Sequence, residues 1–236
     1  MTHAEWEQAI GYLTEVGQTC TPERQEMILL SDVLGVSSQV ELNSSGEEHA
    51  TAGTVLGPFY VAGSPTRRFG SSIVDSPDNG PRATISGTVQ DIHGRPVRGA
   101  TLDIWQNASN ELYAIQDPNQ APTNLRAKFL TGPDGRFQFE TVRPVPYAIP
   151  DDGPVGRLLN STGRHPWRPA HIHFLVTADG YAPLATHVFD AESAYLDSDA
   201  VFGVEESLVM KFVKATGEDR YTATFDIVLS PSGADR

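Results

Sequence analysis

The chain has 236 residues, enough for one large domain or two small ones with a sizeable core. Apolar residues make up 39 % of it, and no stretch approaches the roughly 18 consecutive apolar residues that a transmembrane helix needs. Thirty acidic side chains against seventeen basic ones leave a formal charge of −13. This charge disfavours nucleic acid and anionic membranes as partners, because affinity for phosphate groups comes mostly from lysine and arginine.

Cysteine usage narrows the chemistry further. The single cysteine, Cys20, cannot form an intrachain disulfide, which is typical of a reducing cytosol, and it excludes thiolate-rich zinc and iron–sulfur sites. The first twenty residues carry Glu5, Glu7 and Glu15 where a secretory signal would need a basic start and an apolar run. The sequence therefore predicts a cytoplasmic protein in which His, Tyr, Asp or Glu would bind any metal.

The first third of the chain predicts two helices. Over residues 5–14, apolar side chains recur at helical spacing: Trp6, Ala9, Ile10 and Leu13. A second helix is predicted over residues 21–36, with Thr21 as its N-cap and Pro22 at its first position. Its apolar face would contain Met27, Leu30 and Leu34. The polar residues 41–53 predict a loop.

From about residue 83 the spacing of the apolar residues changes: they recur at every second position, as in β-strands, and no longer at helical spacing. The predicted strands cover residues 83–91, 100–106, 136–142, 171–178, 186–190 and 222–229. Glycine-containing turn sequences separate several of these runs. We therefore expect an α+β protein, mainly a β-sandwich over residues 54–236, with a short helical segment and loop over residues 1–53. The residues from Pro144 to Pro169 predict a long irregular stretch, which in a compact domain is usually functional or disordered.

The segment RPAHIHF carries two histidines that are two positions apart. On a strand, His171 and His173 would lie side by side on one face, while Ile172 and Phe174 would point to the other. Two imidazoles on one face can chelate iron, copper, zinc or nickel. Histidines on a strand can instead serve only as hydrogen-bonding groups, so this motif alone does not decide between a metal site and a purely structural role.

Oxygen donors would have to complete such a site, and the chain has seven tyrosines. Tyr147 lies between prolines at the entry to the long irregular stretch, and Tyr113 lies where a strand gives way to a polar loop. A hydroxyl that caps a loop and a ring that packs in a turn are the structural alternatives for these two residues. Spacing alone does not select them from the seven.

Four longer motifs carry a family resemblance. They are GPFY at 57–60, GTVQDIHGRPVRGATLDIWQ at 87–106, YAIPDDGPVG at 147–156 and GRHPWRPAHIHF at 163–174. Together they resemble the intradiol ring-cleavage dioxygenases, which are the catechol and hydroxyquinol 1,2-dioxygenases, and the likeness extends in the same order over residues 5–229. In that family a non-haem Fe(III) is held by two tyrosines and two histidines. Matched motif by motif, these ligands fall on Tyr113, Tyr147, His171 and His173.

The resemblance implies that the β-sandwich domain uses O₂ to cleave the ring of a 1,2-dihydroxybenzene. Phenolate oxygen is a hard donor that suits ferric iron. Tyr147 would be the ligand that the substrate displaces, and Arg168 would stabilise negative charge on the ring. The alternative for Arg168 is a surface ion pair.

The family's substrate pocket corresponds to Leu29, Asp32, Val55, Leu56, Gly57, Pro58, Phe59, Ile149, Pro150, Arg168 and Val201. The segments ILLSDVLGV and YLDSDAVFGV resemble hydroxyquinol 1,2-dioxygenases more than catechol 1,2-dioxygenases. The carboxylate of Asp32 could bind the third hydroxyl of benzene-1,2,4-triol, or it could cap a helix turn that faces solvent. We expect hydroxyquinol as the substrate and 3-hydroxy-cis,cis-muconate, which tautomerises to maleylacetate, as the product. Catechol and chlorocatechol are the alternatives.

Two features depart from the family pattern. Relatives usually have a longer helical N-terminal region that forms a dimer interface and a lipid-lined tunnel, so neither the dimer nor a bound phospholipid is carried over directly. An exposed apolar face on the N-terminal helices would favour a homodimer. The second departure is His187, where relatives often carry glutamine. Near the metal ligands it would alter their hydrogen bonding, unless it is an ordinary strand residue.

Two interpretations that assign the chain to other functional classes compete with the interpretation as a dioxygenase. The segment from residue 87 to 105 also resembles small β-sandwich modules that only bind or connect, although such modules have no reason to keep two loop tyrosines and a His-x-His pair. A zinc hydrolase would use His171, His173 and an acid. That reading lacks the HExxH helix and would leave Tyr113 and Tyr147 without a role.

Overall fold

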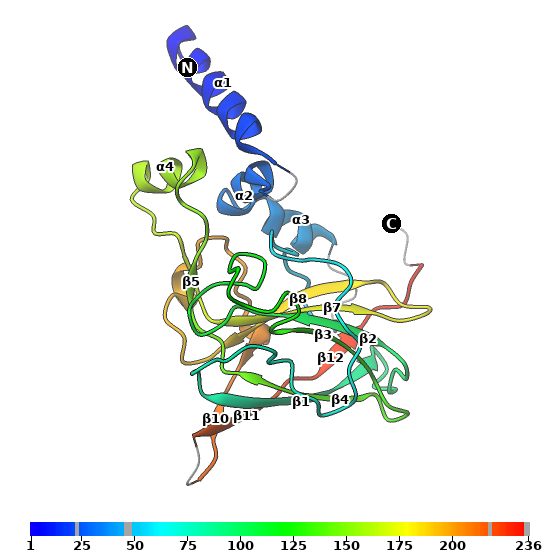
Figure 1. The fold of residues 1–236 in the computed structure, drawn as a ribbon. Helices are drawn as coiled ribbons and strands as arrows, with labels where there is room; N and C mark the ends of the chain where they lie inside the picture. The colour runs from blue at the N-terminus through cyan, green and yellow to red at the C-terminus, as the bar shows by residue number, and fades with distance from the viewer. Residues whose placement is uncertain (22–23, 45–48, 217–218, 234–236) are drawn as a thin grey trace.

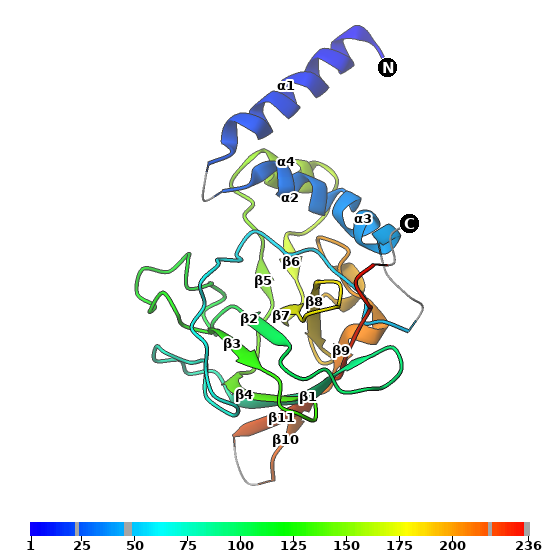
Figure 2. The same ribbon diagram turned by 90° about the vertical axis from the view of Figure 1, so that its right-hand side faces the viewer.

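The structure is a computed structural model that describes residues 1–21, 24–44, 49–216 and 219–233 (Figure 1). Helices gather at one end of the molecule and strands form the body, with helix α1 projecting away from the strands (Figure 2). Within the described ranges, no helix combines the length and the apolar character that crossing a membrane requires. The fold is α+β, as predicted.

Helix α1, His3–Thr19, confirms and extends the first predicted helix. It begins with a capping box, in which Thr2 accepts a hydrogen bond from the Glu5 amide and the Glu5 carboxylate accepts one from the Thr2 amide. Within the chain only Val16 of this helix is buried. The side chains that set its apolar period, among them Trp6 and Leu13, are therefore largely exposed.

The second predicted helix is shorter than expected. Helix α2, Glu26–Val33, begins after Gln25, because the Thr21 hydroxyl closes a turn by accepting the Arg24 amide instead of capping the helix. Pro22 lies outside the described residues. The predicted apolar face is confirmed at Leu30 but wrong at Met27 and Leu34, which are about half exposed. The buried face contains Leu29, Leu30 and Val33, together with Glu26 and Asp32.

Two further helices replace segments that were predicted as irregular. Helix α3, Val36–Ser44, follows a turn at Gly35, so the predicted loop over 41–53 is wrong for its first four residues. Helix α4, Pro154–Ser161, lies inside the stretch predicted as irregular. The buried carboxylate of Glu26 accepts the Val155 amide at 3.1 Å and thereby fastens α4 to α2. Short 3-10 helices cover Leu196–Ser198 and Glu206–Leu208.

One five-stranded sheet is built around the long strand β1, Arg82–Asp91. Strand β4, Arg136–Val142, pairs antiparallel with β1, while β11, Arg220–Thr224, and β12, Ile227–Leu229, both pair parallel with it. Strand β10, Val213–Lys214, extends the sheet beyond β11. The run predicted as one strand over 222–229 is broken at Phe225, whose carbonyl passes so close to Gly87 that a Cβ there would lie 1.8 Å from it.

The other five-stranded sheet has the order β3-β2-β7-β8-β9. Its strands are β3 Arg126–Leu130, β2 Thr101–Trp105, β7 His171–Thr177, β8 Leu184–Asp190 and β9 Val209–Met210. The predictions for β2, β7 and β8 are confirmed, whereas β3, β9 and β10 were missed. A separate two-stranded pair, β5 Tyr147–Ala148 and β6 Trp167–Arg168, also lies in the stretch predicted as irregular.

The two sheets share one hydrophobic core. Side chains from β1 and β4 meet those from β2 and β7, and the ring of Phe174 lies 6.2 Å from both Phe137 and Phe139. A second hydrophobic cluster joins the helices to the other face of the β7 sheet and contains Leu29, Trp105, Tyr113, Tyr147, Ile149 and Val201. Strand β7 therefore lies between two buried layers.

Candidate metal centre

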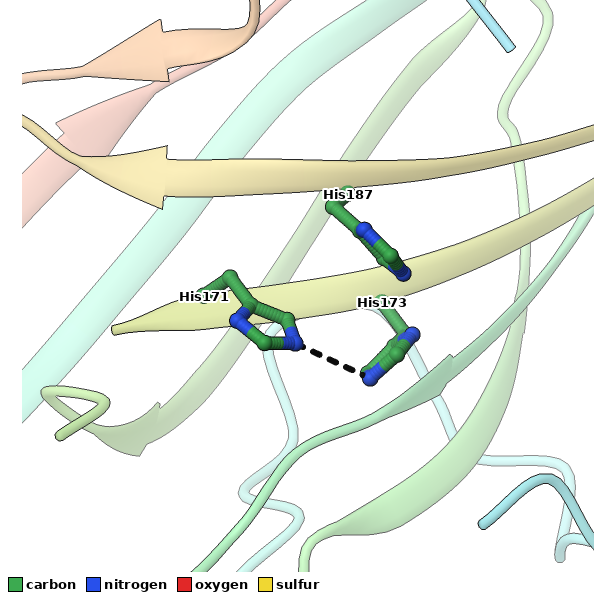
Figure 3. A group of neighbouring side chains, drawn as sticks. All are labelled: His171, His173 and His187. Atoms are coloured by element: carbon green, nitrogen blue, oxygen red, sulfur yellow. Dashed lines mark hydrogen bonds between the residues drawn. The ribbon is translucent and has the colours of Figure 1, made fainter. Parts of the chain in front are cut away.

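The predicted histidine pair projects from β7 into the second cluster. Ile172 and Phe174 point into the core between the sheets, so His171 and His173 occupy the opposite face, as alternation predicts. Both side chains are buried, and their Nε2 atoms lie 3.2 Å apart (Figure 3). The sequence prediction that these two imidazoles meet is confirmed.

A third histidine completes the cluster. His187 on β8 is directly opposite His173 in the register, and its ring extends toward His173 (Figure 3). One nitrogen from each of the three rings can be chosen so that all lie within 4.8 Å of one another. His187 therefore lies directly against the predicted pair, and its effect on the hydrogen bonding of the metal ligands stays a prediction.

Strand register also places Trp105 in the site. On β2, Trp105 is opposite His173 on the side away from β8, and the two rings stack with centroids 4.7 Å apart and planes 11° apart. The sequence reasoning missed this contact. Alternation could have placed Trp105 on the site face of β2, but a strand that is buried on both faces gives no polarity contrast to show which face matters.

Two tyrosines from separate loops reach the histidines. Tyr113, in the loop after β2, places its hydroxyl 2.9 Å from His173 Nε2. Tyr147 on β5 lies with its ring 5.3 Å from that of Tyr113 and 5.5 Å from that of His171. Both tyrosines are 2 % exposed. The structure thus brings together the four residues that the family resemblance selected. Sequence spacing alone could not have selected the two tyrosines.

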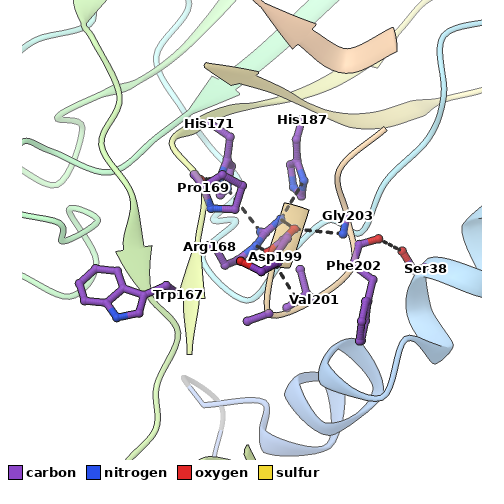
Figure 4. A network of polar contacts seen from close by, with 12 residues as sticks. Ser38, Trp167, Arg168, Pro169, His171, His187, Asp199, Val201, Phe202 and Gly203 are labelled. Atoms are coloured by element: carbon purple, nitrogen blue, oxygen red, sulfur yellow. Dashed lines mark hydrogen bonds and ion pairs between the residues drawn. The ribbon is translucent and has the colours of Figure 1, made fainter. Parts of the chain in front are cut away.

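Arg168 lies beside the cluster because β6 pairs with β5, which sets Arg168 opposite Tyr147. Its guanidinium is buried and forms an ion pair with Asp199, with Nε 3.1 Å from Oδ1 and Nη2 3.3 Å from Oδ2 (Figure 4). The alternative of a surface ion pair is therefore wrong. Sequence reasoning missed Asp199, since in the run DSDA nothing distinguishes it from the exposed Asp197.

The three histidines are held neutral. Burial, followed by the charge of Arg168, lowers the pKa of His171 to about 3. Burial also lowers the pKa values of His173 and His187 well below the ordinary range, and the neighbouring imidazoles and Arg168 act in the same direction. Because His171 Nδ1 lies 2.7 Å from the Pro169 carbonyl, it carries the proton, and the lone pair is on Nε2.

These donors have the arrangement of a metal site. The Tyr113 hydroxyl and His171 Nε2 both lie close to His173 Nε2, at 2.9 and 3.2 Å. Two ligands bound about 2.1 Å from one ion at angles of about 90–110° would be about 3.0–3.4 Å apart, so the spacing suits a shared cation. In the metal-free protein, burial and then Tyr147 raise the pKa of the Tyr113 phenol well above 10.0, so a cation would have to displace its proton.

Comparisons with known proteins agree with this geometry. A family model described as Dioxygenase matches residues 55–231, and one described as Catechol dioxygenase N terminus matches residues 1–52. The chain is 47 % identical to the 6-chlorohydroxyquinol 1,2-dioxygenase of Cupriavidus pinatubonensis over 98 % of its own length and 84 % of the relative's. The chain belongs to the intradiol ring-cleavage dioxygenase family.

Two further relatives of this dioxygenase support the assignment. The chain is 47 % identical to the hydroxyquinol 1,2-dioxygenase of Rhizobium sp., over 93 % of its own length and 75 % of the relative's. The solved structure of hydroxyquinol 1,2-dioxygenase from Pseudomonas putida matches with a TM-score of 0.90 and 43 % identity, covering 98 % of this chain and 85 % of the other. The interpretation as a non-catalytic module is therefore wrong.

The zinc hydrolase reading is also not supported by the geometry. It required an acid beside His171 and His173, but among the described His, Cys, Asp and Glu side chains the third member of the group is His187. Two buried tyrosines adjoin the pair, which a hydrolase of that kind would leave without a role.

Most of the predicted pocket residues adjoin the dioxygenase site. Leu29, Ile149 and Val201 belong to the same buried cluster as Tyr113 and Tyr147, and the Phe59 ring stacks on Tyr113. A Cβ at Gly57 would lie 3.3 Å from the His173 ring. Val55 is buried, and a hydrogen bond with the Val55 backbone acts to raise the pKa of His187, against the larger effect of burial. Leu56 is 39 % exposed, while Pro58 and Pro150 are half-buried, so their place in a pocket wall stays a prediction.

Asp32 lies at the helical side of the site. It is buried on α2, its Oδ1 atom has no hydrogen-bond partner, and it interacts electrostatically with Arg168 and Asp199. Burial raises its pKa, although a hydrogen bond from Ser37 and the charge of Arg168 act in the opposite direction. The interpretation of Asp32 as a cap that faces solvent is therefore wrong.

The neutral histidines predict a pH-dependent stability for the metal-free dioxygenase. Each ring binds a proton near pH 6.5 when unfolded but only at much lower pH when folded, so the unfolded state takes up protons first and stability is lost as pH falls below about 6.5. We expect the free energy of unfolding to decrease by about 1.4 kcal/mol per pH unit for each histidine. Urea unfolding at several pH values measures the slope, and His187→Gln should reduce it by one histidine's share. A stability that is constant from pH 7 to pH 4 would contradict the assignment.

Proposed function

We propose that this dioxygenase cleaves hydroxyquinol between its two adjacent hydroxyl-bearing carbons at a non-haem Fe(III), with Tyr113, Tyr147, His171 and His173 as the metal ligands. The observation that carries the proposal is the convergence of these four buried side chains from three separate parts of the chain. The names of the similar proteins from Cupriavidus, Rhizobium and Pseudomonas support the choice of substrate.

The donor set suits ferric iron. Two imidazole nitrogens and two phenol oxygens are harder ligands than thiolates, and two phenolates would reduce the charge of the centre to +1, which matches a doubly deprotonated diol. When bound, Fe(III) supplies the Lewis acidity and the electron-accepting capacity that make the diol reactive toward O₂. The buried aromatic and aliphatic cluster around the ligands keeps bulk water away from this centre.

The residues of the chain would then divide the remaining tasks. The Tyr147 oxygen takes up a proton as the diol binds, so that one side chain serves as ligand and as general base. The Arg168 guanidinium, opposite Tyr147 in the β5–β6 pair, stabilises negative charge on the ring. The bond between the two hydroxyl-bearing carbons breaks, and both atoms of O₂ enter the product, 3-hydroxy-cis,cis-muconate, which tautomerises to maleylacetate.

Metal analysis combined with a visible spectrum tests the iron site. We expect about one iron per chain and a burgundy-red protein, because tyrosinate-to-iron charge transfer absorbs visible light. Tyr113→Phe should remove much of this absorption, since it removes one phenolate, whereas Tyr181→Phe, which packs against the core between the sheets, should leave it unchanged. A wild-type protein that stays colourless after anaerobic reconstitution with iron would overturn the proposal.

Asp32 is the proposed determinant of substrate choice. It is a buried carboxyl group with a free Oδ1 atom on α2, whose neighbour Leu29 belongs to the same cluster as the ligand tyrosines. The third hydroxyl of hydroxyquinol would satisfy this atom, whereas catechol would leave it without a partner. An unsatisfied buried polar group costs about 1–3 kcal/mol, which corresponds to about 5- to 150-fold in kcat/KM.

Substitution of Asp32 tests this preference. Asp32→Leu keeps the branched shape and removes the polar atoms, so kcat/KM for hydroxyquinol should fall by about 5- to 150-fold relative to that for catechol. Asp179→Asn, on an exposed turn, is the matched control and should leave the ratio unchanged. Steady-state assays with both diols give the ratio, and a wild-type enzyme that turns over catechol equally well would contradict the role of Asp32.

The two sheets with their shared core support assignment of residues 54–236 to a β-sandwich catalytic domain, with residues 1–53 as the helical segment. The helical segment is part of the proposed pocket, because Leu29 on α2 packs in one cluster with Ile149 and Val201. The two units would therefore act together, with the sandwich supplying the metal ligands and the helices closing the pocket.

The exposed apolar side chains of α1 support a homodimer. Trp6, Ile10 and Leu13 lie on one face of the helix at helical spacing and are 44–48 % exposed in the single chain. A second copy could cover this face. Light scattering after size exclusion should give twice the chain mass, and replacement of all three by glutamine should give a monomer. Gln8→Lys on the same helix is the control, and a monomeric wild type would overturn this part of the proposal.

A further inference from the structure

All three guanidinium nitrogens of Arg168 have partners (Figure 4). Nε and Nη2 donate to the two carboxylate oxygens of Asp199, Nη2 also lies 3.3 Å from His187 Nδ1, and Nη1 lies 3.3 Å from His171 Nε2. The guanidinium is therefore held on one side by Asp199 and His187, and its remaining nitrogen points toward a proposed metal ligand.

The loop around Asp199 is built to bind this guanidinium. Asp199 accepts the Val201 amide at 3.3 Å and the Gly203 amide at 3.0 Å in addition to the guanidinium, so both carboxylate oxygens have two partners. A Cβ at Gly203 would lie 3.1 Å from Arg168 Nη2 and 3.2 Å from Asp199 Oδ2. A side chain there would press into the ion pair, so glycine lets the loop close over it. The loop is joined to α3, since the Ser38 hydroxyl donates to the Phe202 carbonyl.

The same contacts determine how His187 can act. A guanidinium only donates hydrogen bonds, so His187 Nδ1 is the acceptor and the neutral ring carries its proton on Nε2. In this tautomer the one lone pair of the His187 ring is directed at the guanidinium. His187 is thus set up to orient Arg168.

We propose that Asp199 and His187 are positioning residues that hold the Arg168 guanidinium with Nη1 directed at the bound diol. The inference rests on the proposed function. If His171 Nε2 binds the metal, its lone pair is no longer available to Arg168, and the Nη1 N–H is released next to the reaction site. Asp199 and His187 keep the guanidinium plane in place at that moment, so no reorientation is needed when charge develops on the ring.

Charge and hydrogen-bond substitutions separate positioning from mere support of the fold. Asp199→Asn keeps the shape but removes the charge, and we expect kcat to fall by about 10- to 100-fold with KM and iron content nearly unchanged. His187→Gln keeps an oxygen that can accept from Arg168 and should stay near wild type, whereas His187→Phe should lose about 10-fold or more. Asp197→Asn, an exposed neighbour two positions away, is the matched control and should behave as wild type.

Nuclear magnetic resonance of the iron-free protein provides a readout that does not depend on turnover. With arginine labelled by ¹⁵N, the Arg168 Nε–H signal, assigned by its loss in Arg168→Lys, should be protected from solvent exchange in wild type and in Asp197→Asn. It should exchange much faster in Asp199→Asn. A second, independent check of folding is the retention of iron binding and of the tyrosinate colour by each variant.

The outcomes distinguish failure of this inference from failure of the proposed function. Wild-type kcat in Asp199→Asn with unchanged Nε–H protection would overturn the role of Asp199, and so would a loss confined to KM or to iron content. A His187→Gln variant as impaired as His187→Phe would overturn the role of His187. If wild type binds no iron and cleaves no diol, the proposed function fails, and the exchange measurement alone then decides whether Asp199 holds Arg168.

Discussion

The structure depends on one strand that is buried on both faces. Strand β7 directs Ile172, Phe174 and Val176 into the core between the sheets and presents His171 and His173 to the opposite layer. The strand cannot shift by one residue without exchanging these two sets, which would bury imidazoles in the core and remove them from the site. The packing that stabilises the fold therefore also holds the two imidazoles in position.

The neighbours of β7 extend this constraint across the sheet. Trp105 on β2 and His187 on β8 lie opposite His173 in the ladder, so one row across three strands contains an indole and two imidazoles. Further groups come from the β5–β6 pair, which sets Tyr147 opposite Arg168. Strand pairing, and not loop conformation, places most members of the site.

Burial determines the protonation states of the residues in this site. Imidazoles that stay neutral keep lone pairs for a cation, and a phenol that resists ionisation gives up its proton only to a strong competitor such as a metal. Two buried carboxyl groups, Asp32 and Asp199, share the neighbourhood of a single guanidinium, and the geometry commits Arg168 to Asp199. The Oδ1 atom of Asp32 is left without a hydrogen-bond partner.

Sequence alone determined the change from helical to strand periodicity, the pairing of His171 with His173 on one face and, through motif order, the family. These depend on local spacing, which the backbone geometry of a helix or strand translates directly into direction. Motif matching selected Tyr113 and Tyr147, but only the tertiary structure showed that they reach the histidines. It alone also decided that Asp199 and not Asp197 binds Arg168, and that Met27 and Leu34 are exposed. Each of these depends on contacts between segments far apart in the chain, whose distances no local pattern encodes.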